Sequence, residues 1–325
     1  MTAVSAAGGT FRGIIPHLLL LAFMLALAGC GAARPVIYPS DIYEPLPQAA
    51  PIPHGQGRIW QADFPGQAPS YIFGTIHVND PRVLELPEAA EAAFAGAQFA
   101  AFEADMADEL SEAEQRRHFE LPEGSDLETL LGEETYEKLQ SLALFQFITV
   151  KRLEDMQPWI IWTMIGNRSV PIDVQQKEDE LVLDDWLQQR ARDDGKEVIA
   201  LETTEEQIRI FSGLSLEDQV SMLRSAIEAY DDPRVKVQWV ELYLDGDLAQ
   251  RYALWQRFLG YLEPGVAQRF NNRLATRRNR AMVEHLLPIF AKGSTFVAVG
   301  VMHLPGEQGI LRLLEQRGYT VTRLQ

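Results

Sequence analysis

Two histidines share the same local sequence, and each follows an apolar segment. The pattern Gly-x-x-His runs from Gly74 to His77 and again from Gly300 to His303. A glycine at such a point lets the backbone leave a strand where a side chain would obstruct it. Imidazole is a frequent ligand of divalent transition metals and a frequent acid or base in catalysis. The repeated pattern therefore predicts that the two imidazoles act in one site.

Carboxylates stand at the ends of two further strand-like segments. Glu103 lies near the end of segment 99–105, and Glu202 ends segment 197–202. Two imidazoles and one carboxylate leave coordination positions open on a divalent metal, as catalysis requires. Such a metal lowers the pKa of a bound water and polarises a carbonyl. A further carboxylate would serve as a base or would orient a ligand histidine.

Alternative roles remain open for several of these side chains. Asp105 competes with Glu103, because it lies two residues further on and on the same strand face. Glu202 also fits as an acid at a helix N-terminus, where the helix dipole favours negative charge. A histidine at a strand end is often a hydrogen-bonded structural residue. His118 and His285 lie in polar helical patterns, which predict that both are exposed to solvent.

A run of basic residues also has two interpretations. Arg273, Arg277, Arg278 and Arg280 fall within one predicted helix and would form a solvated face. Alternatively, Arg278 and Asn279 point toward the histidines and hold a substrate carboxylate or a catalytic acid.

The strands that carry these residues follow from the apolar pattern. In α/β sheets, ligands bind at the carboxyl ends of the strands, where loops are free to carry function. The apolar run 296–299 predicts a strand buried on both faces, and 197–202 predicts another buried strand. Segments 58–64 and 70–77 predict a hairpin with Pro65-Gly66 in its turn.

Helices are predicted for most of the remaining chain. Apolar residues recur at helical spacing over much of residues 111–287, and the Arg-rich segment 269–280 is predicted to be one helix. The predicted fold class is α/β. It has a central mixed β-sheet with helices, and a helical subdomain of about 111–287, less its central strand, covers the site at the strand ends.

Residues 1–29 are predicted to be a lipoprotein signal peptide. Their apolar run 18–27 is too short to span a bilayer. It ends in Leu27-Ala28-Gly29-Cys30, a pattern that allows a diacylglyceryl thioether on the cysteine and cleavage before it. The proline-rich residues 30–57 are predicted to be an extended, lipid-anchored tether, and residues 58–325 the folded domain.

The predicted location is the cell envelope, facing the periplasm. Gly31 rather than Asp follows Cys30, which resembles outer-membrane sorting if the host is diderm. Several acyl chains give stable anchoring, so the membrane is an expected partner through Cys30. The formal net charge of −17 argues against nucleic acid as a partner and suits cation binding. The sequence leaves the oligomeric state open.

Several short segments together resemble a known family. In chain order they are Tyr71–His77 with Pro87, Phe102-Glu103-Ala104-Asp105, Met156-Gln157-Pro158-Trp159, Gly195-Lys196-Glu197-Val198, Leu201-Glu202-Thr203 with Gln207, Tyr243 with Gly246-Asp247, Arg278-Asn279 with Met282, and Val299–Gly306 with Gly309 and Gly318-Tyr319. Their order and the closing segment make the match specific. The chain resembles the TraB/GumN family, in the group that includes the Tiki-type metalloproteases and, more remotely, the erythromycin esterase and ChaN-like proteins.

The resemblance implies a metal-dependent hydrolase that uses two Gly-x-x-His motifs and a glutamate. These transfer to His77 and His303 as metal ligands, together with Glu103. Glu202 and Arg278-Asn279 match further family positions, which makes them catalytic candidates.

Asp184 matches a family aspartate that usually follows a glycine by two residues. Val182 replaces that glycine here, so the loop at Asp184 departs from the family pattern.

The predicted function is metal-assisted hydrolysis, with a peptide or protein as substrate. His77 and His303 would bind Mn²⁺, Co²⁺ or Zn²⁺. Glu103 would act as ligand or base, and Arg278 would stabilise charge on the substrate. The alternatives are a non-enzymatic metal- or ligand-binding envelope lipoprotein and a metal-independent ester hydrolase. The sequence contains no Gly-x-Ser-x-Gly and no His-Glu-x-x-His, which disfavours a serine hydrolase and a standard zincin.

Overall fold

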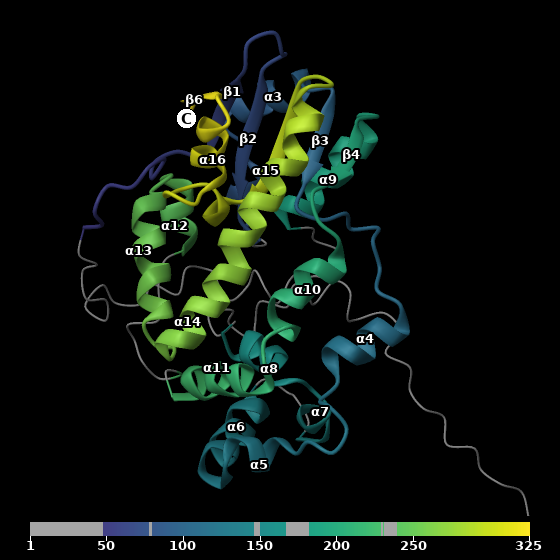
Figure 1. Ribbon diagram of the computed structural model, residues 1–325, viewed down its shortest axis with the longest axis vertical. Helices are drawn as coiled ribbons and strands as arrows, with labels where there is room; N and C mark the ends of the chain where they lie inside the picture. Colours follow the sequence, from purple (N-terminus) through teal and green to yellow (C-terminus); the bar gives the residue numbers. More distant parts are fainter. Residues whose placement is uncertain (1–47, 78–79, 146–149, 167–181, 229, 231–238) are drawn as a thin grey trace, which may run out of the picture.

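The computed structural model describes residues 48–77, 80–145, 150–166, 182–228, 230 and 239–325 (Figure 1). The predicted signal peptide and Cys30 lie outside these residues. Within the described ranges, every helix is too short or too polar to span a bilayer.

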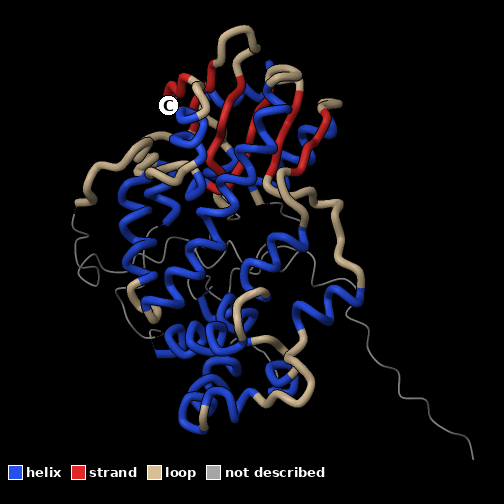
Figure 2. Tube along the Cα trace, viewed as in Figure 1, coloured by secondary structure: helices blue, strands red, loops and turns tan. Residues whose placement is uncertain are grey.

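A six-stranded mixed sheet lies at one end of the molecule, with strand order β4-β3-β5-β2-β1-β6 (Figure 2). The strands are β1 (Ile59–Asp63), β2 (Ser70–Thr75), β3 (Phe99–Phe102), β4 (Glu197–Ala200), β5 (Thr295–Gly300) and β6 (Thr320–Arg323). Strands β2 to β5 pair in parallel, whereas β1 pairs antiparallel with β2 and β6. The predicted α/β class, the mixed sheet and the β1–β2 hairpin are confirmed.

Helices surround the sheet and extend well beyond the carboxyl ends of its parallel strands (Figure 1). Those before β4 are α2 (Pro81–Leu84), α3 (Glu88–Gly96), α4 (Glu112–Phe119), α5 (Leu127–Leu131), α6 (Glu133–Phe145), α7 (Val150–Glu154), α8 (Pro158–Gly166) and α9 (Leu183–Asp193). Those after β4 are α10 (Thr204–Ser212), α11 (Leu216–Glu228), α12 (Trp239–Leu244), α13 (Leu248–Leu259), α14 (Pro264–Asn271), the π-helical turn η3 (Asn272–Thr276), α15 (Arg277–Phe290), the 3₁₀ turn η4 (Val301–His303) and α16 (Ile310–Gln316).

Two hydrophobic cores result from this arrangement. The first lies on the sheet, where Phe296 of β5 meets Phe94 of α3 with ring centroids 5.2 Å apart. Figure 1 shows α15 and α16 in front of the sheet and α3 behind it. The second core is wholly helical and aromatic, with Trp159 stacked on Phe211 at 5.3 Å. The helical core covers the strand ends, and α15 runs from one core toward the other (Figure 1).

Strand β4 differs from its sequence prediction. The apolar run 197–202 predicts a buried strand, but Glu197 and Ala200 are exposed and Val198 and Ile199 are only half-buried. The physical reason is position, because β4 stands at the edge of the sheet beside β3. A short apolar run does not distinguish a central strand from an edge strand.

Contacts of the folded domain begin before Arg58. The Gly306 amide donates to the Pro53 carbonyl at 2.8 Å, and the Gly57 amide donates to the Gly246 carbonyl at 2.9 Å. The last residues of the proline-rich segment therefore lie against the domain.

The two motif glycines are required for space rather than for an unusual φ. A Cβ on Gly74 would lie 2.5 Å from Val301 Cγ2, and a Cβ on Gly300 would lie 3.0 Å from Glu103 Oε1. The first glycine lets η4 pack on β2. The second lets a carboxylate approach the end of β5.

We predict that Gly74→Ala destabilises the protein by about 1–3 kcal/mol, the usual cost of overpacking a core. Urea unfolding would measure the difference. Adding Val301→Ala should restore part of the loss, because it removes the clashing methyl group. The control is Gly96→Ala at the end of α3, where nothing lies within 4 Å of the new Cβ. A Gly74→Ala variant as stable as the wild type would contradict the steric explanation.

Candidate functional site

The strand register places both motif histidines at the same edge of the sheet. Thr75, at the end of β2, pairs in parallel with Gly300, at the end of β5. His77 therefore follows β2 at the point where η4, which carries His303, follows β5. Strand β3 lies on the other side of β5 and delivers Glu103 to the same edge. The carboxyl ends of β2, β5 and β3 therefore lie side by side, as the sequence predicts.

His303 is held by a hydrogen bond at each ring nitrogen. Its Nδ1 lies 2.5 Å from Asn279 Oδ1, and its Nε2 lies 3.1 Å from Arg278 Nη1. A guanidinium only donates, so Nε2 accepts and the proton of the neutral ring belongs on Nδ1. Asn279 is oriented in turn, because its Nδ2 donates to the Gln308 carbonyl at 2.7 Å. The lone pair on His303 Nε2 thus points into the site.

His77 lies against the carboxyl group of Asp184. Its Nδ1 lies 3.1 Å from Asp184 Oδ2, within ion-pair distance although not aligned as a hydrogen bond. Thr75 Oγ1 donates to the other oxygen, Asp184 Oδ1, at 2.6 Å. The buried His77 Nε2 has no hydrogen-bond partner among the described residues. A buried polar atom in this state is where a ligand would be expected.

Glu103 is bound on both carboxylate oxygens. Oε1 accepts from the Gly300 amide at 2.6 Å, and Oε2 accepts from Arg278 Nη2 at 2.5 Å. The same arginine donates from Nε to Glu202 Oε2 at 2.9 Å, and Gln207 Nε2 donates to Glu202 Oε1 at 2.9 Å. Arg278 therefore links the carboxylates that follow β3 and β4.

The ionisation of the site is controlled by burial and by this guanidinium. Burial lowers the pKa of His77 to about 3 and that of His303 to about 4, so both rings are neutral at pH 7. Burial raises the pKa of Glu103, but His303, Arg278 and the Gly300 amide outweigh it and bring that pKa to about 2. Since His303 is neutral at pH 7, Arg278 is the positive charge that keeps Glu103 ionised there.

Asp184 does not need the glycine that its family counterpart follows. Val182 has φ −72° and ψ 163°, an extended conformation that any residue adopts, and Asp184 stands in the first turn of α9. Burial raises the pKa of its carboxyl well above the usual value. With Val182 in place of the family glycine, the Asp184 carboxyl still lies 3.1 Å from His77 Nδ1.

The arginines of α15 point to different sides of this helix, which decides between the two interpretations of the basic run 273–280. Arg278 and Asn279 are buried and face the site, whereas Arg277 and Arg280 are exposed on the opposite side of α15. Arg273 is half-buried and its Nη1 donates to the Arg209 carbonyl at 3.3 Å.

The two competing acids are also separated. Asp105 forms an ion pair with Arg192 and accepts from the Ala107 amide at 2.8 Å, so it turns away from the histidines. Glu103 is the acid that faces them. Glu202 precedes the α10 capping box but directs its carboxylate to Arg278, rather than acting only at the helix terminus.

The prediction that His118 is exposed is wrong. The ring is buried in the helical core, with Nδ1 2.8 Å from Ser212 Oγ and Nε2 3.2 Å from Glu205 Oε1. The residues just before it, Arg116 and Arg117, are polar, and tertiary contacts from α10 bury it.

The sequence gives little sign of the residues that support the site. Thr75, Gln207 and Gln308 orient site residues, and Thr75 and Gln308 do so across 109 and 29 residues of the chain. The segment 269–280 is not one regular helix, because the π-helical turn η3 separates α14 from α15. Such turns occur frequently at functional sites.

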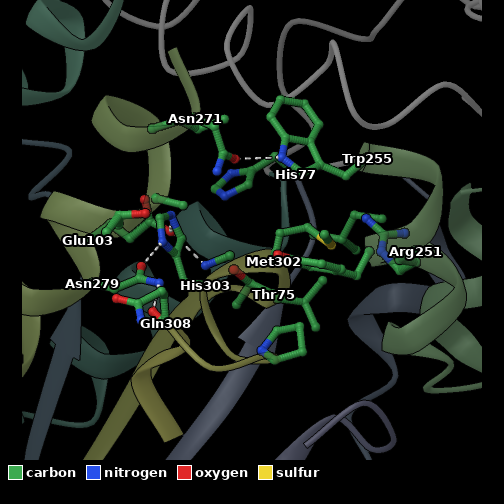
Figure 3. A pocket seen from close by; sticks show the side chains of 18 residues that line it. Thr75, His77, Glu103, Arg251, Trp255, Asn271, Asn279, Met302, His303 and Gln308 are labelled. Carbon is green, nitrogen blue, oxygen red and sulfur yellow. Dashed lines mark hydrogen bonds and ion pairs between the residues drawn. The ribbon is translucent and has the colours of Figure 1, made fainter. Parts of the chain in front are cut away.

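These side chains open onto a cavity of about 130 Å³. Figure 3 shows Glu103, Asn279 and His303 gathered on one side of it, with Met302 toward Arg251 on the other. The cavity has room for about one aromatic ring, since a cavity of about 150 Å³ holds a benzene molecule.

A divalent metal fits the donor chemistry, although the described side chains do not form a complete cage. No group of three or more His, Cys, Asp or Glu residues in the described ranges is placed to hold a metal ion. Both rings are neutral at pH 7, His303 Nε2 accepts a hydrogen bond, and an oxygen lies near each Nδ1, as in metal-ligating imidazoles. Coordination through His303 Nε2 would replace its hydrogen bond from Arg278 Nη1.

The family model for the TraB/PrgY/gumN family matches residues 59–323. The chain belongs to this family. The TraB/PrgY/gumN match covers all six strands, from the start of β1 to the end of β6. It also includes every site residue described above.

Among curated proteins, this family member is similar to Metalloprotease TIKI2 of Danio rerio, with 26% identity over 306 residues. Metalloprotease TIKI1 of Xenopus tropicalis is 27% identical over 302 residues, and the Metalloprotease TIKI homolog of Nematostella vectensis is 24% identical over 305 residues. Each match covers 78% of this chain but only 58%, 59% and 64% of those relatives, respectively. The chain thus spans less than two thirds of their length. No solved structure matches it significantly.

We predict that Arg278→Ala destabilises the protein by about 3–5 kcal/mol, because it leaves two buried carboxylates without their counter-charge. Urea unfolding at pH 7 would measure this loss. The matched control is Arg280→Ala on the exposed side of the same helix, which should change stability by less than about 0.5 kcal/mol. If both variants unfold at the same urea concentration, the guanidinium does not stabilise the site.

Proposed function

We propose that this protein is a metal-dependent hydrolase of the cell envelope that cleaves peptide bonds. The observation that carries the proposal is the presentation of two neutral imidazoles, His77 and His303, beside one ionised carboxylate, Glu103, around one cavity. Each ring has an oxygen at Nδ1 and directs Nε2 into the site. Similarity to proteins named metalloproteases supports both the metal and the peptide substrate.

In this proposal His77 and His303 bind Mn²⁺, Co²⁺ or Zn²⁺ through Nε2. Such an ion supplies Lewis-acid polarisation of a carbonyl and lowers the pKa of water. Asn279 orients the His303 ring by a hydrogen bond, and the Asp184 carboxyl lies 3.1 Å from His77 Nδ1. Such partners orient imidazole ligands and raise their basicity.

Glu103 suits the role of an anionic ligand better than that of a general base. A base works best when its pKa lies near the operating pH, and the pKa of Glu103 is lowered to about 2. Its negative charge therefore persists throughout the physiological range.

Arg278 acts as a positioning residue in this proposal. Its N–H groups donate to Glu202, Glu103, the Leu274 carbonyl and His303, all within the protein. Arg278 therefore positions Glu103 and Glu202 and does not act as the group that contacts the substrate.

Metal titration would test the ligand set. We expect full-length protein in detergent to bind one divalent ion per chain by calorimetry. A His77→Gln/His303→Gln double variant should bind the ion at least about 100-fold more weakly. Even mutation of a residue that only hydrogen-bonds a ligand lowers metal affinity by about 10–100-fold. Cleavage of a peptide mixture should follow the same loss.

The control for this titration is His118→Gln, which removes a buried imidazole outside the site. It should retain wild-type metal affinity. Equal affinity in the wild type and the double variant would exclude the metal site. Metal binding without cleavage of any peptide would favour a non-enzymatic metal-binding protein, and cleavage of esters alone would favour an ester hydrolase.

The envelope location is a separate part of the proposal. It rests on the sequence Leu27-Ala28-Gly29-Cys30 after an apolar run and on the proline-rich segment that follows. The lipid on Cys30 would anchor the domain to the membrane on its periplasmic face, and the outer membrane is favoured in a diderm host. The net charge of −17 opposes nucleic acid as a partner.

We predict that Cys30→Ser abolishes incorporation of labelled palmitate when the protein is expressed in a diderm bacterium. Serine lacks the thiol that forms the thioether. Ser40→Ala, in the proline-rich segment, should incorporate the label as the wild type does. Equal labelling of the Cys30→Ser variant would show that this cysteine is not the lipidated residue.

A further inference from the structure

The cavity that the histidines line also has apolar lining residues. Trp255 of α13, Leu274 of η3 and Met302 of η4 line it, and their side chains are apolar. We call this group the apolar subsite. It adjoins the histidines, because Met302 directly precedes His303 in η4 and both line the same cavity.

The indole of the apolar subsite is fixed in one orientation. Trp255 Nε1 donates to Asn271 Oδ1 at 2.9 Å, an interaction that Figure 3 shows at the edge of the cavity. The ring also stacks on Phe258 with centroids 5.3 Å apart and an interplanar angle of 25°. A buried indole with its N–H satisfied presents a rigid apolar surface.

Another part of the cavity lining comes from the π-helical turn η3. Asn272–Thr276 follow π geometry between two α-helices, and Leu274 within this turn lines the cavity. Its carbonyl accepts a hydrogen bond from Arg278 Nη1 at 3.0 Å. The wall of the apolar subsite is therefore tied to the same guanidinium that holds Glu103.

Met302 completes the apolar subsite at the junction of the two cores. Its side chain is half-buried and packs against both the sheet core and the helical core. Methionine adapts its shape to different apolar partners. A cavity of about 130 Å³ accommodates one side chain rather than an extended apolar surface.

We propose that the apolar subsite binds one aromatic or long aliphatic side chain of the substrate, at a residue flanking the scissile bond. This inference rests on the proposed peptidase function, because the histidines line the same cavity and would hold the reacting bond next to the bound side chain. The preferred substrates would be peptides with an aromatic or long aliphatic side chain beside the scissile bond.

The test uses full-length protein in detergent and two hexapeptides that differ only by Phe or Ser at one position. Binding is measured by calorimetry in EDTA, where no metal supports cleavage, and cleavage is measured separately with Mn²⁺ or Co²⁺. We expect the Phe peptide to bind about tenfold more tightly or better, since burying one such side chain gives a difference of this order. We expect cleavage beside the Phe.

The informative variant is Met302→Glu, which places a charge in the apolar subsite and should abolish the preference for Phe. Met302→Leu should retain it, and this rescue separates loss of the subsite from loss of folding. The control is Leu324→Ala, since this leucine is 40% exposed near the C-terminus. It should leave the preference unchanged.

The outcomes separate the two proposals. In one outcome the wild type prefers the Phe peptide, Met302→Glu abolishes this preference, and neither peptide is cleaved. This result supports the apolar subsite and overturns the peptidase function. Cleavage with equal use of both peptides, in the wild type and in Met302→Glu alike, supports the peptidase function and overturns the apolar subsite.

Discussion

The parallel pairing of β2 with β5 is the constraint on which the site depends. Its register sets Thr75 opposite Gly300, so the two Gly-x-x-His segments leave the sheet side by side. A slip of one residue would reverse the faces of every side chain in a strand and separate the imidazoles. Both strands are central and buried, which leaves little freedom for such a slip. The geometry of His77 and His303 is thus a consequence of sheet packing.

Charge balance at the strand ends links the fold to the proposed chemistry. Glu103 and Glu202 formally carry two negative charges, and Arg278 supplies one positive charge among them. The neighbouring imidazoles are neutral at pH 7 because burial lowers their pKa values. A buried group with excess negative charge is costly unless a cation compensates it. A bound cation would offset this excess charge, which agrees with the proposed metal-dependent chemistry.

The two cores contribute different parts of the cavity. The sheet provides rigid strand ends that hold polar groups within hydrogen-bonding distance of one another. The helical core provides the cover, with Trp255 fixed by Asn271 and by stacking. Helix α15 connects them and carries Arg278 and Asn279 on its buried side. Changes in the helical cover can therefore alter the shape of the cavity while the strand ends that carry the histidines stay in place.

The sequence by itself determined the α/β class, the strand segments and the residue types of the site, because apolar periodicity and the repeated Gly-x-x-His are local patterns. It left open Glu103 against Asp105 and the two faces of the arginine run, and it misjudged β4 and His118. Tertiary structure decided these points. Strand order placed β4 at an edge, helix phase turned Arg278 inward, and distant partners such as Asp184 fixed the rings. Such contacts depend on register and packing between segments far apart in the chain, and no local pattern encodes them.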